Sequence, residues 1–182
     1  VKPTWPGSVQ PPASDASPAS PATGTGLAAL GRGPLVLVVI AAVVPRLPHL
    51  GAAVVGWHSW RQADTAAIAR NFYRGGMNLL YPAVDWSGAG RGYVESEFPL
   101  FPYLAAALYR VLGPDVVWGR ALAIAFATGA ALYLARLASR HVDRWSAACA
   151  AVAFSLFPLN TYIGAAFMPE SLMLLASVAA IP

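Results

Sequence analysis

Charged side chains are scarce in this sequence: they make up 11% of 182 residues, against about a quarter in a typical soluble domain. Hydrophobic residues reach 57%, and the mean hydropathy is +0.55. A chain this short can bury only part of its surface in one aqueous core. The excess of apolar sequence therefore predicts an integral membrane protein.

Cysteine and the common catalytic motifs are also nearly absent. The single Cys149 excludes an internal disulfide, and no metal-binding motif surrounds it. The sequence contains no phosphate-binding Gly-rich loop, no Ser-centred nucleophile elbow and no HExxH motif, so a nucleotide-dependent cytoplasmic enzyme is unsupported. The twelve basic residues are scattered and flank apolar runs, which is typical of membrane topology and predicts no nucleic-acid partner.

Long apolar runs are what the sequence has in abundance. Residues 1–33 are rich in Pro, Ser, Ala and Gly and predict a disordered cytoplasmic tail, whereas residues 34–182 form a membrane region. The predicted spans cover about 33–52, 117–138, 145–164 and 170–182. Pro45 and Pro48 predict a loosened end to the first span. Because the last run stops in mid-span, we expect a fragment of a larger protein.

The basic residues predict the orientation of these spans. An arginine cluster at 136–144 marks the cytoplasmic side, and Arg32 precedes the first span. The loop of about 53–116 must then begin and end on the outer side. Inside it, Leu100–Leu112 is apolar but too short to cross, so we predict a helix lying in the outer interface or re-entering it. The expected fold is all-α, with a long helical first outer loop.

A second loop helix is predicted over about Trp60–Arg74, which is Ala-rich and followed by two glycines. Helical spacing groups Asp64 with Trp60, Ile68, Asn71 and Phe72, on a face expected to pack against the protein or the membrane interface. The side opposite carries Gln62, Ala66, Ala69 and Tyr73. A carboxylate on such a face needs a partner, and Arg61 is the nearest. The alternative is a desolvated general base or ligand.

Three further residues are candidates for the same outer surface. Glu97 precedes the interfacial helix, and Glu170 precedes the last span. Each has a structural alternative as an acid at a helix N-terminus. His58 has the alternative of an amphipathic anchor at the interface. No cofactor is specified by the residues, although Asp64 and Glu97 could together hold a divalent cation.

The order of these motifs resembles a known family. The runs HSWRQADTAAIARNFY, GYVESEFPLFPYL, VWGRALAI and FMPES are similar to the N-terminal part of GT-C glycosyltransferases, over roughly residues 34–182. The nearest branches are those resembling protein mannosyltransferases, aminoarabinose transferases and galacturonosyltransferases. The resemblance implies a multi-pass enzyme of the cell (plasma) membrane. Such an enzyme transfers a sugar from a polyprenyl phosphate to a lipid, glycan or protein acceptor on the non-cytoplasmic face.

The resemblance also implies roles for particular residues. Asp64 stands where the family has its candidate catalytic base, and Glu97 stands where a second acid supports substrate or metal binding. Arg61, Arg120, Glu170 and His58 are the expected substrate-binding positions. The main rivals are a transporter, which should carry ionisable residues within its spans, a non-catalytic scaffold, and an inactive truncated product.

Overall fold

The computed structural model describes residues 30–86, 88, 90–95 and 97–182, so most of the predicted tail lies outside the described residues. Its helices are α1 (Arg32–Val43), the 3-10 helix η2 (Val44–His49), α2 (Ser59–Gly75), α3 (Leu100–Leu112), α4 (Val116–Ala138), α5 (Arg144–Leu156), α6 (Pro158–Ile163) and α7 (Glu170–Ala179). Among the described residues, β pairing is limited to one antiparallel bridge between Ala83 and Tyr93. The predicted all-α class is confirmed.

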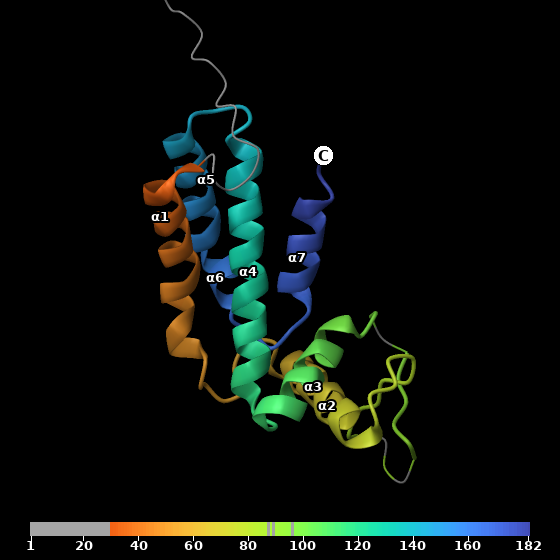
Figure 1. Cartoon of the computed structure of the whole chain (residues 1–182). Coiled ribbons are helices and arrows are strands. Elements are labelled where there is room, and N and C mark those ends of the chain that lie inside the picture. The colour runs from red at the N-terminus through yellow and green to blue at the C-terminus, as the bar shows by residue number, and fades with distance from the viewer. Residues whose placement is uncertain (1–29, 87, 89, 96) are drawn as a thin grey trace, which may run out of the picture.

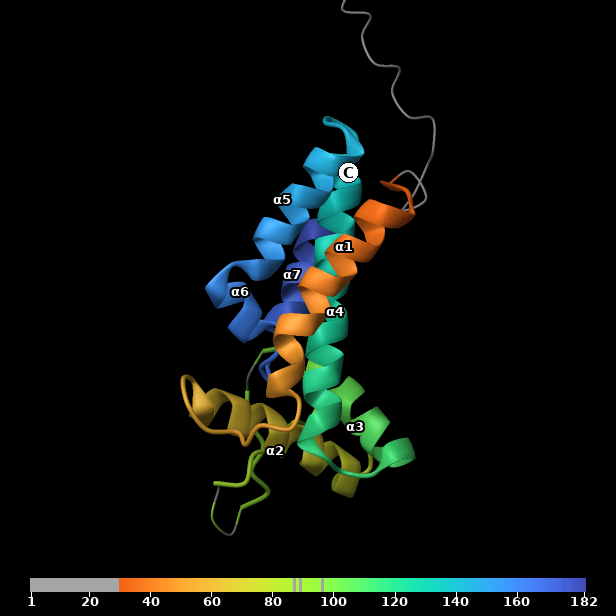
Figure 2. The same ribbon diagram turned by 90° about the vertical axis from the view of Figure 1, so that its left-hand side faces the viewer.

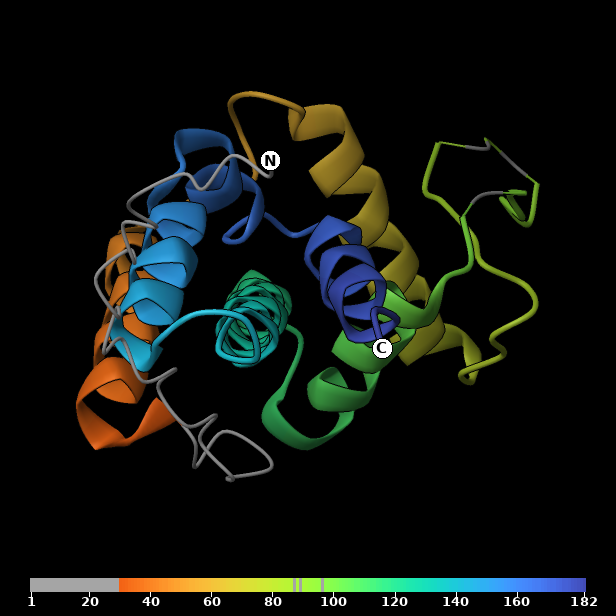
Figure 3. The ribbon, with the colours of Figure 1, turned by 90° about the horizontal axis from the view of Figure 1, so that it is seen from above.

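The helices form an upright bundle with two helices lying across one end. Figure 1 shows α1, α4, α5 and α7 side by side, and α2 and α3 at the lower end of α4. The quarter turn in Figure 2 shows the same division. Seen from above, α4 lies between the α1–α5 pair and α7, in agreement with its packing against all three (Figure 3). The two loop helices pack against each other.

Two helices are long and apolar enough to cross a membrane: Arg32–His49, which joins α1 to η2, and Val116–Ala138, which is α4. These two helices lie over the segments 33–52 and 117–138, for which the sequence predicts the first two spans. Asp115 begins α4 by accepting a hydrogen bond from the Val117 amide at 2.9 Å. Small side chains let α1, α4 and α5 approach closely, because their shared core contains six alanines.

The prolines loosen the end of the first span as predicted, because the chain continues past Val43 as a 3-10 helix. Arg46 within this turn is only 1% exposed. Its guanidinium donates to three backbone carbonyls, those of Ala42, Ser155 and Asn160. These carbonyls lie at or near helix C-terminal ends, where the backbone carries partial negative charge. A buried cation is thus accommodated without a carboxylate.

The third predicted span, about 145–164, is not one continuous helix. It consists of α5 and the short α6, with a break at Phe157, whose φ and ψ of −56° and 126° are extended. Pro158 explains the break, because a proline disfavours helical geometry in the residue before it. The predicted fourth span is likewise represented by the ten residues of α7. Neither helix is long enough by itself to cross a membrane.

The bundle has two chemically different ends. The turn end comprises residues 30–34 and 136–144, and it carries four arginines against one aspartate. The loop end comprises residues 50–115 and 164–170. It contains every acidic residue of the described chain except Asp143. The carboxylates are therefore collected at one end of the long helices.

Candidate active site

The loop helix α2 positions the candidate residues. It runs from Ser59 to Gly75 and ends where Gly76 adopts a left-handed φ of 97°, as the two glycines predicted. Ile68 and Phe72 are buried, as expected for the face that carries Asp64, while Trp60 is 65% exposed. The expectation of one inward face is wrong, however, since the opposite side is buried too.

That opposite side is covered because the segment before α7 packs under α2 while α3 packs beside it. The buried residues of α2 are Gln62, Thr65, Ala67, Ile68, Ala69 and Phe72. Among them, Gln62 is 2% exposed and Ala69 is fully buried. The ring of Phe72 meets Tyr103 of α3 edge to face, with 5.6 Å between ring centroids.

Arg61 joins three separate segments at this end of the molecule. Its Nε donates to Glu170 Oε1 at 2.8 Å, and its Nη2 donates to Glu97 Oε1. Arg61 belongs to α2, Glu97 to the segment before α3, and Glu170 is the first residue of α7. The expected partner of Arg61 was Asp64. That expectation is wrong, because the two glutamates occupy the guanidinium instead.

The three side chains form a charged network with a net charge of −1. The hydrogen bond from Arg61 to Glu97 raises the pKa of Arg61, so the arginine stays protonated. The side chains of Arg61, Glu97 and Glu170 are 31%, 49% and 28% exposed, and each ion pair in such a setting contributes about 0.2–1 kcal/mol. Glu170 Oε2 is buried and has no hydrogen-bond partner, so one carboxylate oxygen of the network is unsatisfied.

Asp64 lies one helical turn beyond Arg61 and is paired differently. Its Oδ1 accepts a hydrogen bond from the indole Nε1 of Trp86 at 3.3 Å. Within the described residues no cationic group forms an ion pair with Asp64. Asp64 is partly exposed, so its carboxylate oxygens are accessible as hydrogen-bond acceptors.

Gln62 holds the start of α2 in place, a role that the helical pattern did not indicate. Its Oε1 accepts from the Phe167 amide at 3.3 Å, and its Nε2 donates to the Tyr162 hydroxyl at 3.3 Å. The Tyr162 hydroxyl in turn donates to the Trp57 carbonyl. The sequence did contain a signal for this burial. Gln62 is followed at spacings of three and four residues by Thr65, Ala69 and Phe72, which places all four on one face of the helix.

His58 stands at the N-terminal end of α2 and is exposed. Its backbone has a left-handed φ of 54°, which is uncommon for a residue with a side chain. Its ring lies against Trp57 at 4.6 Å between centroids. The structure therefore places His58 at the same helix end as Arg61, next to an exposed tryptophan.

Arg120 lies beneath the site and binds backbone. It is 4% exposed and donates to the carbonyls of Ala53 at 3.2 Å and Ala165 at 3.3 Å. These contacts tie α4 to the segment before α2 and to the segment before α7. The geometry makes Arg120 a positioning residue for the loop end.

The predicted residues are thus brought together in part. Arg61, Glu97 and Glu170 are in direct contact, and Asp64 is on the next turn of the same helix. Within the described residues no group of three or more His, Cys, Asp and Glu side chains is arranged to hold a metal ion. A divalent cation remains an expectation from the sequence.

No protein-family model, no curated protein and no solved structure matches this chain.

Proposed function

We propose that this chain is part of a multi-pass membrane glycosyltransferase. In this proposal the enzyme moves a sugar from a polyprenyl-phosphate donor to an acceptor at the non-cytoplasmic membrane face, with Asp64 as the general base. Such a donor stays in the bilayer, so its sugar–phosphate bond lies at the interface. Catalytic side chains are needed at that depth, near the ends of membrane-crossing helices.

The observation that carries the proposal is the pairing at the loop end. Arg61 binds Glu97 and Glu170 and leaves Asp64 without a cationic partner. Three segments distant in sequence are thereby held around one turn of α2, and α2 itself lies across the end of α4 (Figure 1). A carboxylate that no cation holds, next to a fixed charged network, is available to act as a general base.

In the proposed reaction Asp64 takes the proton of an acceptor hydroxyl. The hydroxyl oxygen bonds to the anomeric carbon while the bond from that carbon to the phosphate oxygen breaks. This single displacement inverts the anomeric carbon and releases the polyprenyl phosphate as an anion that needs no proton. Because Arg61 is occupied by two glutamates, it acts as a positioning residue. The phosphate charge is then met by another cation, from another part of the protein or from solution.

The test uses membranes that contain the complete gene product, supplied with radiolabelled polyprenyl-phosphate sugars and with an acceptor extract from the same cells. We expect Asp64→Asn to lower transfer by about 100-fold or more, the usual cost of losing a general base.

Asp143→Asn is the matched control. Asp143 lies at the turn end and caps α5 through the amides of Trp145 and Ser146, and asparagine caps helices equally well. Transfer by this variant should equal that of the natural protein. Near-normal transfer by Asp64→Asn, or the absence of transfer from every donor offered, would overturn the proposal.

A further inference from the structure

A cavity opens beside the C-terminal half of α2, away from the arginine–glutamate network. Its volume is about 570 Å³, which falls within the range of small-molecule sites. It lies between α2 and the segment of residues 78–93, which is closed on itself by the Ala83–Tyr93 bridge. The Val84 amide donates to the Gly92 carbonyl at 2.9 Å across this closure. The wall opposite α2 is therefore built from two stretches, 78–86 and 90–93, that this bridge holds together.

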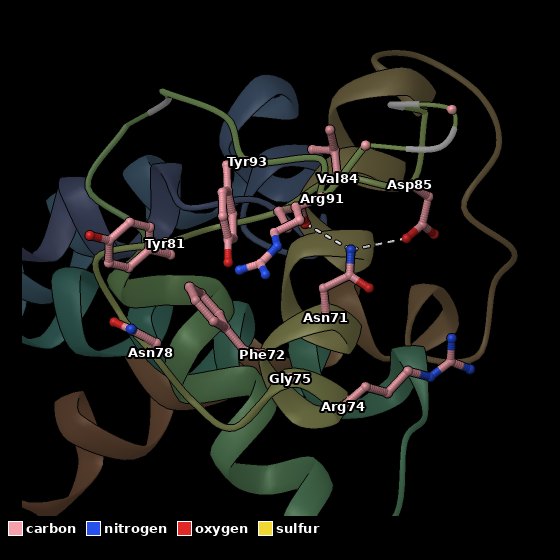
Figure 4. A pocket seen from close by; sticks show the side chains of 13 residues that line it. Asn71, Phe72, Arg74, Gly75, Asn78, Tyr81, Val84, Asp85, Arg91 and Tyr93 are labelled. Carbon is pink, nitrogen blue, oxygen red and sulfur yellow. Dashed lines mark hydrogen bonds between the residues drawn. The ribbon is translucent and has the colours of Figure 1, made fainter.

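Aromatic rings form one side of the cavity. The rings of Tyr81 and Tyr93 are in contact and tilted by 54°, with 5.3 Å between ring centroids, and both residues are 55% exposed. Phe72 contributes a third ring from α2. Figure 4 shows the two tyrosines and Phe72 around one side of the space. Exposed aromatic faces flanking a polar cavity suit a ring-shaped ligand with apolar C–H faces, such as a sugar.

Two amide side chains line the cavity. Asn71 Nδ2 donates to the Ala83 carbonyl at 2.8 Å and to Asp85 Oδ1 at 3.0 Å, which leaves its Oδ1 to accept from a ligand. Asn78 Oδ1 accepts from the Leu80 amide at 3.2 Å, which leaves its Nδ2 to donate. Figure 4 draws the guanidinium of Arg91 beside Tyr93, Phe72 and Asn71, whereas the side chain of Arg74 extends away from them.

The charges at the cavity favour an anion. The charged residues of the lining are Arg74, Arg91 and Asp85, which sum to one positive charge. Asp85 is moreover paired with Arg70. Arg91 forms no ion pair among the described residues, so its charge is available to a ligand.

The cavity also lies close to the proposed base. Asn71 follows Asp64 by seven residues, which places both on the same face of α2 about 10 Å apart at 1.5 Å per residue. Asp85 lines the cavity, and the next residue, Trp86, donates to Asp64. A molecule held in the cavity would therefore extend toward Asp64.

We propose that this cavity binds an anionic saccharide, meaning a sugar that carries a carboxylate or a phosphate, as part of the acceptor. The tyrosine pair stacks on the sugar ring, Asn71 and Asn78 hydrogen-bond its hydroxyls, and Arg91 binds the anionic group. The role as acceptor site rests on the proposed function. The binding itself does not, because it can be measured without transfer.

The experiment measures binding to the purified full chain in detergent by saturation-transfer NMR. One pair of probes is cellobiouronic acid and cellobiose, which differ by one carboxylate. A second pair is glucose 6-phosphate and glucose, with inorganic phosphate alone as an additional probe. We expect each anionic sugar to bind more tightly than its neutral partner and more tightly than inorganic phosphate. The pair with the larger difference in affinity between its anionic and its neutral sugar shows whether the cavity prefers a carboxylate or a phosphate.

Variants separate the two contributions. Arg91→Gln should weaken the anionic sugars about tenfold, equivalent to about 1.4 kcal/mol, and leave the neutral sugars unchanged. Tyr93→Ala should weaken both kinds, since it removes the stacking face. Arg110→Gln, an exposed arginine of α3 outside the cavity, should change neither and serves as the charge-matched control.

Two results would overturn the inference. One is equal binding of the anionic and neutral sugars by the natural protein, and the other is an unchanged preference in a folded Arg91→Gln protein. Asp64→Asn should retain full binding. A protein that binds anionic sugars but transfers nothing would therefore refute the proposed function while leaving the cavity assignment intact.

Discussion

At the scale of single residues, two aspartates on neighbouring segments differ in whether a cationic side chain binds them. Asp85 accepts hydrogen bonds from Asn71 and Arg70, whereas Asp64 accepts one from Trp86. The cationic partner of Asp85 favours the charged form of that carboxylate, whereas Asp64 has no cationic partner among the described residues. Asp85 is therefore a structural acid of the cavity wall, and Asp64 is the candidate base.

The pairing of Asp85 predicts a pH dependence for the 78–93 loop. The hydrogen bond from Asn71, followed by the contacts with Arg70, lowers the pKa of Asp85 below its ordinary value of 3.8. The stabilisation is then fully present above about pH 4 and is lost as the pH falls through the lower, folded-state value. Its size should be only a few tenths of a kcal/mol, because the side chain is 46% exposed.

Amide hydrogen exchange at Val84 and Val94 measures this effect, since both amides donate across the loop. Protection factors should fall between pH 5 and pH 2.5 in the natural protein. In Asp85→Asn they should be lower at pH 5 and should vary less with pH. Parallel profiles for the two proteins would contradict the assigned pairing.

At the scale of helices, the position of Glu170 depends on a contact between α4 and the segment before α7. Phe167 is fully buried and lies edge to face with Phe101 at 5.8 Å. A Cβ placed on Gly119 of α4 would lie 2.0 Å from the Phe167 ring. Only glycine allows this approach, and the backbone from Phe167 to Glu170 is positioned by it.

Gly119→Ala should therefore destabilise the protein by about 1–3 kcal/mol, the usual cost of overpacking a core, and displace Glu170 from Arg61. Gly129→Ala in the same helix is the matched control, since its Cβ would meet Leu175 at an ordinary 3.4 Å. The control should be neutral or slightly stabilising, because alanine favours helices. Thermal unfolding in detergent compares the two, and equal midpoints would contradict the packing described.

At the scale of the whole molecule, charge divides the bundle into two ends. Four arginines mark the turn end, and the loop end carries the acids, the arginine–glutamate network and the cavity. The helices α1, α4, α5 and α7 alternate in direction. The arginine-bearing segments therefore lie together at one end of the bundle, and the acid-bearing loops lie together at the other (Figure 1). Such a division is expected of a protein oriented in a membrane by its basic turns.

Thiol labelling in intact cells tests that orientation. In a Cys149→Ala background, Pro114→Cys places a thiol at the loop end, and Val142→Cys places one at the turn end. A membrane-impermeant maleimide should label Pro114→Cys in intact cells and Val142→Cys only after permeabilisation. The reverse result would contradict the orientation, and equal labelling of both in intact cells would contradict a membrane between them.

The sequence by itself determined the features that depend on neighbours along the chain. The loop helices, the loosened end of the first span and the length of α4 followed from Gly and Pro positions, helical period and apolar run length. The break at Phe157 was missed because hydropathy does not change there, although Pro158 was a local signal.

Only the tertiary structure decided which side chains meet. Arg61 had Asp64 as its nearest acid along the helix, but it pairs with Glu170, 109 residues away, and with Glu97. Gln62 is likewise buried by residues distant in sequence, because Phe167 and Tyr162 pack against it and form hydrogen bonds with it. Helical spacing says which residues share a face, but it does not say what packs there. That depends on the whole bundle, and it is what leaves Asp64 without a cationic partner.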